Sequence, residues 1–161
     1  MKKKGWIDQL ISGEMKKGKG RGKIQSKMLE DLMLDYRKIN DSMNLLMSER
    51  KNLAYPQLQS EIDQMVSEKA KHAKIVESLI SQLGGMVEQS TKQAVTSLAK
   101  GNFKEIFSLE TELNELLTEQ ANFAEDYGFF EISDNLRTIR NQQAQLNEQL
   151  ERIIMRINTE I

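Results

Sequence analysis

The chain has 161 residues and a net charge of −1, which is enough length for one domain with its own core. It contains no cysteine, which excludes disulfides, thiolate metal sites and a cysteine nucleophile. A single proline, few aromatic residues and many Leu, Ile, Met, Glu, Gln and Lys indicate an all-α protein. No apolar stretch approaches the roughly 20 residues of a membrane-spanning helix, and the N-terminus is too polar for a signal peptide. We therefore expect a cytoplasmic protein, with attachment to a membrane surface as the alternative.

Residues 1–23 are predicted to form a basic arm ahead of an acidic body. Residues 1–27 carry nine Lys or Arg against two Asp or Glu, whereas residues 28–161 carry fourteen against twenty-two. Apolar residues recur beside lysines at helical spacing in 1–15, and residues 16–23 (KKGKGRGK) have the composition of a mobile linker. The predicted docking arm consists of Lys2, Lys3, Lys4, Trp6, Ile7, Leu10, Ile11, Lys16, Lys17, Lys19, Arg21 and Lys23.

Three interpretations of this arm stay open from sequence alone. It is a solvated tail, an interfacial anchor or docking peptide led by Trp6, or a basic segment that binds phosphate backbones. The acidic body opposes nucleic acid, so docking to a protein or a membrane surface ranks above nucleic-acid binding.

Four long helices are predicted in residues 24–161, at about 24–53, 56–83, 102–127 and 130–160. Apolar residues alternate at spacings of three and four, a proline suits the first turn at 56, and glycines follow the helices that end near 83 and 127. Tight joints near 54 and 128 predict two antiparallel hairpins, and residues 86–101 are predicted to form a crossover that contains a short helix. The expected buried stripes are Leu29, Leu32, Tyr36, Ile39, Met43 and Leu46; Leu58, Ile62, Met65, Val76, Leu79 and Leu83; Ile106, Leu109, Leu113, Leu116, Phe123 and Tyr127; and Ile132, Leu136, Ile139, Leu146, Leu150, Ile153 and Ile157.

Polar residues interrupt two of these stripes at mid-helix. Lys69 and the only histidine, His72, stand at core positions of the second helix, and Gln143 does so in the fourth. Because a buried charge without a partner is costly, Lys69 requires an anionic partner.

The stretches at 48–80 (SERKNLAYPQLQSEIDQMVSEKAKHAKIVESLI) and 121–139 (ANFAEDYGFFEISDNLRTI) resemble the two helical hairpins of the ferritin-like superfamily, and of its rubrerythrin branch in particular. The resemblance covers about residues 24–161. It implies a ferritin-like four-helix bundle, two hairpins joined by a crossover.

The resemblance also implies where a carboxylate-bridged di-iron site would lie, with one glutamate on each first helix and an E-x-x-H motif on each second helix. The matched positions are Tyr36; Lys69 and His72; Leu109 and Glu112; and Gln143 and Leu146. Only His72 and Glu112 keep a ligand type, and iron needs several oxygen donors whose charge offsets the metal. We therefore expect no bound iron, no cofactor and no catalytic residue. Instead, a polar cluster should pair Lys69 with Glu112, with Tyr36, His72 or Gln143 completing the hydrogen bonds.

The expected function is a non-enzymatic scaffold or protein-interaction module with an N-terminal docking arm. There is no nucleophile motif, phosphate-binding glycine loop or metal-binding repeat. A homodimer is expected, because Met33, Leu45, Met47 and Ile154 flank the stripes and are apolar. One alternative is a divergent metal-binding oxidoreductase or ferroxidase that uses His72 and Glu112, for which acid–base chemistry by the same pair is also conceivable. A second alternative is a membrane-surface or nucleic-acid binder.

Overall fold

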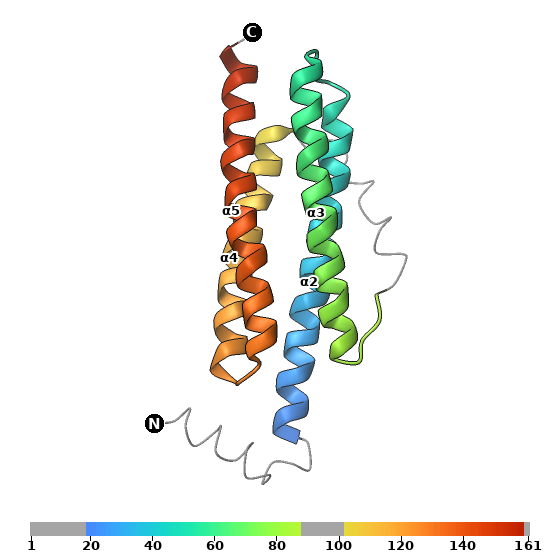
Figure 1. Cartoon of the computed structure of the whole chain (residues 1–161), viewed down its shortest axis with the longest axis vertical. Coiled ribbons are helices and arrows are strands. Elements are labelled where there is room, and N and C mark those ends of the chain that lie inside the picture. The colour runs from blue at the N-terminus through green and yellow to red at the C-terminus, as the bar shows by residue number, and fades with distance from the viewer. Residues whose placement is uncertain (1–18, 88–101, 160–161) are drawn as a thin grey trace.

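The computed structural model describes residues 19–87 and 102–159, and it arranges them as a bundle of four α-helices (Figure 1). The helices are α2 (Lys19–Arg50), α3 (Pro56–Gln82), α4 (Phe103–Asp126) and α5 (Phe130–Thr159). The predicted all-α bundle of four helices is confirmed. None of the helices in these two ranges has an apolar stretch long enough to cross a membrane.

The first helix begins earlier than the sequence predicts. Residues 19–23, which were expected to belong to a linker, form the first turns of α2. Lys and Arg are good helix formers, and the buried Ile24 and Met28 anchor the turns that follow. The rest of the predicted docking arm, residues 1–18, lies outside the described residues.

Two helices end in the same glycine-dependent motif. At the end of α3, Gly84 has φ +86°, and the Gly85 N–H donates to the Ile80 carbonyl at 2.9 Å. At the end of α4, Gly128 has φ +84°, and the Phe129 N–H donates to the Ala124 carbonyl at 2.8 Å. This is the Schellman arrangement, in which a left-handed residue after the helix lets the chain satisfy the last carbonyls. The glycine stop signals of the sequence are therefore confirmed.

The four helices form two antiparallel hairpins, α2–α3 and α4–α5, with α2 packed on α4 and α3 packed on α5. In Figure 1, α3 ends at the lower end of the bundle and α4 begins at the upper end, so these two helices run parallel on a diagonal. The connection between them therefore has to join opposite ends of the bundle. The short helix predicted within 86–101 falls on residues 88–101, outside the described part of the chain.

The core consists of two apolar clusters, one in each half of the bundle. The lower cluster is built around Leu32, Tyr36, Ile39, Val76, Leu79, Leu113, Leu117, Leu136 and Ile139. The upper cluster is built around Leu45, Leu46, Leu58, Ile62, Met65, Ile106, Leu146, Leu150 and Ile153. The predicted stripes of α2, α3 and α5 supply most of both clusters, although Leu29, Met43, Leu83 and Ile157 are only partly buried.

The predicted stripe of α4 is wrong in its middle. Leu109 and Leu116 are half-buried, whereas Glu110 and Leu117 are buried. The buried face follows Ile106, Glu110, Leu113, Leu117, Gln120 and Ala124. An assignment that places only apolar residues inside cannot find a face that passes through a glutamate and a glutamine.

Candidate functional site

A layer of polar side chains separates the two apolar clusters. Each helix contributes one of them: Ser42 from α2, Lys69 from α3, Glu110 from α4 and Gln143 from α5. All four are buried, and the Lys69 side chain has no exposed surface at all. Along α2, the layer lies between Ile39, which belongs to the lower apolar cluster, and Leu46, which belongs to the upper one. It lies at the same level of the other three helices.

The layer is a closed hydrogen-bond network around one ion pair. Lys69 Nζ lies 2.8 Å from Glu110 Oε1 and donates also to Gln143 Oε1 at 3.1 Å. Gln143 Nε2 donates to Glu110 Oε1 at 3.0 Å and to Asn147 Oδ1 at 2.8 Å. Ser42 Oγ donates to Glu110 Oε2, so both carboxylate oxygens have partners.

This arrangement meets the requirements for burying two charges. The ammonium and carboxylate neutralise each other, and neutral donors and acceptors take up remaining hydrogen-bonding capacity of both groups. A network that is complete is rigid and favours one relative position of the helices, whereas an incomplete one would be strongly destabilising. The layer therefore connects all four helices at one level of the bundle.

His72 lies one turn from Lys69 and is also fully buried, but its hydrogen-bond partner lies outside the polar layer. Its Nε2 lies 2.8 Å from Gln142 Oε1 on α5, and its Nδ1 has no hydrogen-bond partner within the described chain. An amide oxygen only accepts, so Nε2 carries a hydrogen and donates to Gln142. Burial lowers the pKa of His72, the Lys69 charge lowers it further, and the bond to Gln142 acts in the opposite direction. The imidazole is therefore a neutral bridge between α3 and α5.

The structure corrects the predicted partner of Lys69. Glu112 is exposed and pairs with Lys38 Nζ at 3.2 Å, while Glu110 occupies the core. Residues two apart on a helix point about 200° apart, so Glu110 and Glu112 cannot both face the core. Gln143 is part of the network as predicted, whereas Tyr36 packs in the lower apolar cluster and His72 bonds to Gln142.

Three members of the network were missed from the sequence: Glu110, Ser42 and Asn147. The spacing contains a signal for Glu110, because it stands four residues after Ile106 and three before Leu113. A core lysine requires a buried carboxylate, and this position supplies it. Ser42 has no comparable signal, because the neighbouring Met43 fits the apolar pattern better.

The layer does not fit the di-iron centre that the resemblance implies. It offers one carboxylate, a serine hydroxyl, an amide and a positive ammonium, whereas hard metal ions need several anionic oxygens. Within the described ranges there is no group of three or more His, Cys, Asp or Glu that could hold a metal ion. His72 and Glu112 do not share a site either, because His72 is buried against α5 and Glu112 is exposed beside α2.

A second buried polar pair lies lower in the seam between α2 and α4. Asp35 has no exposed surface, and burial raises its pKa to about 7, while the neighbouring side chain of Gln120 lowers it. Neither carboxylate oxygen of Asp35, nor Oε1 of Gln120, has a hydrogen bond of normal geometry within the described residues. The sequence pattern did not indicate this pair, because Asp35 stands beside the stripe residue Tyr36.

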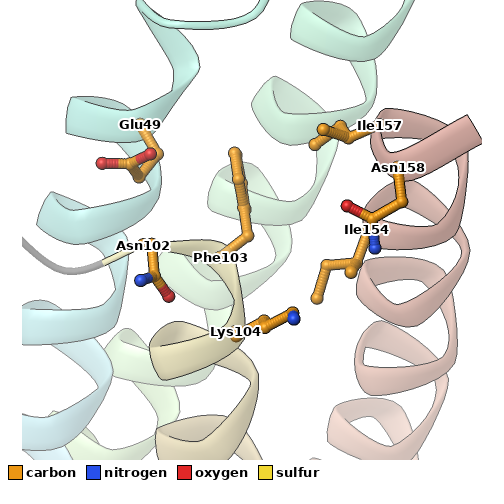
Figure 2. Close-up of a pocket in the computed structure, with 7 residues that line it drawn as sticks. All are labelled: Glu49, Asn102, Phe103, Lys104, Ile154, Ile157 and Asn158. Carbon is orange, nitrogen blue, oxygen red and sulfur yellow. The ribbon is translucent and has the colours of Figure 1, made fainter. Parts of the chain in front are cut away.

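A surface hollow of about 330 Å³ lies at the upper end of the bundle. Figure 2 shows Phe103 of α4 standing between Glu49 of α2 and the isoleucines of α5. Ile154 and Ile157 supply the apolar wall of α5. Lys104 lies at the same opening, so the hollow carries charges of both signs.

The residues expected at a dimer interface are only partly at the surface. Leu45 is 1% exposed and belongs to the upper cluster, so it cannot contribute to an interface. Met47 is 43% exposed, while Met33 and Ile154 are partly buried.

No model of a known protein family matches the chain, and neither curated proteins nor solved structures gave a match.

Proposed function

We propose that this chain is a ferritin-like bundle in which a charged hydrogen-bonded layer replaces the metal centre, and that it acts as a non-enzymatic scaffold or protein-interaction module. The observation that carries the proposal is the ion pair of Lys69 and Glu110 at 2.8 Å in the middle of the core. A lysine ammonium at that place contributes positive charge where a metal would need negative charge.

The burial of the polar layer also supports a structural role. A catalytic or binding residue has to reach a substrate, usually in a concave pocket. Lys69, Glu110 and Gln143 are buried and use their hydrogen-bonding groups on one another. Within the described residues, the polar groups of this layer are committed to holding the helices.

The interaction role is supported by the upper end of the bundle. The hollow at Phe103 has an apolar wall and opposite charges at Glu49 and Lys104, and Met155 of α5 is 59% exposed. A two-fold related copy could place each charge opposite its complement, as isologous interfaces require. We therefore propose a homodimer through this end, with the N-terminal arm available for a protein partner or a membrane surface.

Metal analysis of the full chain, purified without chelators, tests the first part of the proposal. We expect only trace iron, manganese or zinc, and an unchanged thermal midpoint after treatment with EDTA. Incubation with ferrous iron should likewise leave the midpoint unchanged, since a ligand that binds only the folded state raises it. Stoichiometric iron, or a midpoint that falls with EDTA, would support the oxidoreductase alternative instead.

A further inference from the structure

The seam between α2 and α4 joins the two hairpins and contains two buried polar contacts, two helical turns apart on α2. At the upper contact, Ser42 donates to Glu110, whose other oxygen binds Lys69. At the lower contact, Asp35 of α2 meets Gln120 of α4. The upper contact is complete, and the lower one is not.

At the lower contact the amide of Gln120 lies against Asp35 and lowers its pKa, but the buried acceptors have no hydrogen bond of normal geometry within the described chain. Both Asp35 oxygens and Gln120 Oε1 are buried without a hydrogen bond of normal geometry among the described residues. Leaving a buried carboxylate charged and unpaired is unfavourable, and such groups bind a proton instead. A protonated carboxyl group supplies the missing donor, because its O–H can reach an amide oxygen.

We propose that Asp35 and Gln120 form a proton-binding site that holds the two hairpins together. In the neutral acid form, the Asp35 hydroxyl donates to Gln120 Oε1 across the seam. Loss of the proton leaves a charge in an apolar interface, which weakens the contact between α2 and α4.

The surroundings favour the protonated form near neutral pH. Burial raises the pKa of Asp35 to about 7, against the lowering effect of the Gln120 side chain; Asp31 raises the pKa as well, and Lys38 lowers it. Both charged residues belong to α2, and Lys38 is itself paired with Glu112 of α4. The side chains that α3 contributes to this half of the core are apolar: Ala73, Val76, Leu79 and Ile80.

A proton explains the site better than a cation does. Two side chains offer three oxygens, whereas calcium and magnesium take six or more ligands, and the seam around them is apolar. A single hydrogen on Asp35 removes the buried charge and supplies a donor to Gln120 Oε1.

The test compares Asp35→Asn with the unchanged full chain in urea unfolding at a series of pH values from 5.5 to 7.5. Between pH 3.8 and about 7 the folded chain holds a proton at Asp35 that the unfolded chain has lost, so raising the pH favours unfolding. Over this series the unfolding constant of the unchanged chain should rise relative to the variant by at least about tenfold. Asp134→Asn on α5 is the matched control, since this carboxylate is exposed, and it should leave the pH profile unchanged. A constant ratio for Asp35→Asn would overturn the proposal.

Three further measurements keep the proposal open to refutation. If Asp35→Asn does not fold, carboxyl NMR of the unchanged chain should show Asp35 titrating near neutral pH, and titration below pH 5 would refute the site.

Hydrogen exchange at pH 8, compared with the variant at the same pH, should be faster in α2 and α4 around residues 35 and 120. Faster exchange spread equally over all four helices would contradict the proposal that the Asp35–Gln120 contact holds α2 against α4. Stabilisation of the unchanged chain at pH 8 by millimolar magnesium or calcium would show a cation site and overturn the proton site.

Discussion

Lys69 and Glu110 connect the two helices that lie on a diagonal of the bundle, α3 and α4, through the middle of its core. Neighbouring helices already share long apolar contacts, but diagonal helices are joined mainly by what fills the centre. Because each residue also bonds to Gln143 of α5, and Glu110 to Ser42 of α2, one ion pair holds all four helices at a common level. The energetic consequences of this arrangement can be measured.

Removing one member of the pair should be much worse than removing both. Lys69→Met leaves a buried carboxylate, and Glu110→Gln leaves a buried ammonium. Each should lower the free energy of unfolding by about 3–5 kcal/mol. The double variant leaves no buried charge, and Gln at 110 can still bond to Ser42 and Gln143, so much of the loss should be recovered. Urea unfolding of the four proteins gives the coupling free energy.

The matched control is the exposed pair between the same hairpins, Lys38 and Glu112. Its lysine and glutamate side chains are 27% and 56% exposed, and such pairs contribute about 0–1 kcal/mol. Lys38→Met and Glu112→Gln should therefore have small, nearly additive effects. Equal coupling in the two cycles would show that Lys69 and Glu110 are not isolated from water in solution.

The sequence predicted the elements of this fold well because their signals are local. Apolar spacing identified four helices, and Pro56, Gly84 and Gly128 placed the boundaries beside them within a residue or two, whereas α2 ends at Arg50, three residues before its predicted end. The start of α2 was less predictable. A basic, glycine-containing segment has little tendency to fold alone, but it extends a helix that is already anchored by Ile24.

The candidate site was predicted only in part because its partners are distant in the chain. The requirement that Lys69 have a buried carboxylate followed from its place in the stripe, and so did the participation of Gln143. Which glutamate supplies the carboxylate depends on the rotation of α4 about its axis. The predicted stripe through Leu109 and Leu116 gave the wrong rotation, because both residues are only half-buried. The pair of Asp35 and Gln120 was not predicted, because Asp35 stands beside the stripe residue Tyr36 and Gln120 interrupts the buried face of α4 that the sequence prediction missed.

His72 should titrate below the ordinary histidine range. Burial lowers its pKa from 6.5, so below that pH the unfolded chain binds a proton more readily than the folded chain does. The stability that the neutral ring provides is therefore present above pH 6.5 and is lost as the pH falls. As the chain has one histidine, its single Hε1 resonance reports the midpoint directly.

The stability consequence is best measured against His72→Gln, which keeps an N–H donor toward Gln142. Comparison at each pH cancels the titration of Asp35, whose effect on stability has the opposite sign. The unchanged chain should lose stability relative to this variant as the pH is lowered from 7 toward 5. A midpoint at or above 6.5 would mean that the imidazole is hydrated or paired with a carboxylate.

The glycines at the helix ends should respond to alanine in the opposite way from a glycine within a helix. Gly84 and Gly128 have φ near +85°, where a Cβ is strained, so alanine should cost about 1–2 kcal/mol at either position. Gly22 lies in α2, where an added Cβ would meet no atom within 4 Å, so alanine there should stabilise by up to about 1 kcal/mol. Thermal unfolding of the three variants measures both signs, and destabilisation by Gly22→Ala would contradict the helical assignment of residues 19–23.

The proposed dimer should depend on the upper end of the bundle and not on the lower end. Met155 lies at the same end of α5 as the hollow residues Ile154 and Ile157 but about 100° around the helix from Ile154, and it is 59% exposed. A new charge within an interface at this end of the bundle is unfavourable, so Met155→Glu should shift the chain toward monomer without changing its helical content. Phe130, 62% exposed at the turn between α4 and α5, lies at the opposite end and provides the control Phe130→Glu. Sedimentation of the full chain over a range of micromolar concentrations measures the association. Dissociation by Phe130→Glu alone would place the interface at the lower end, and a monomer at every concentration would refute the dimer.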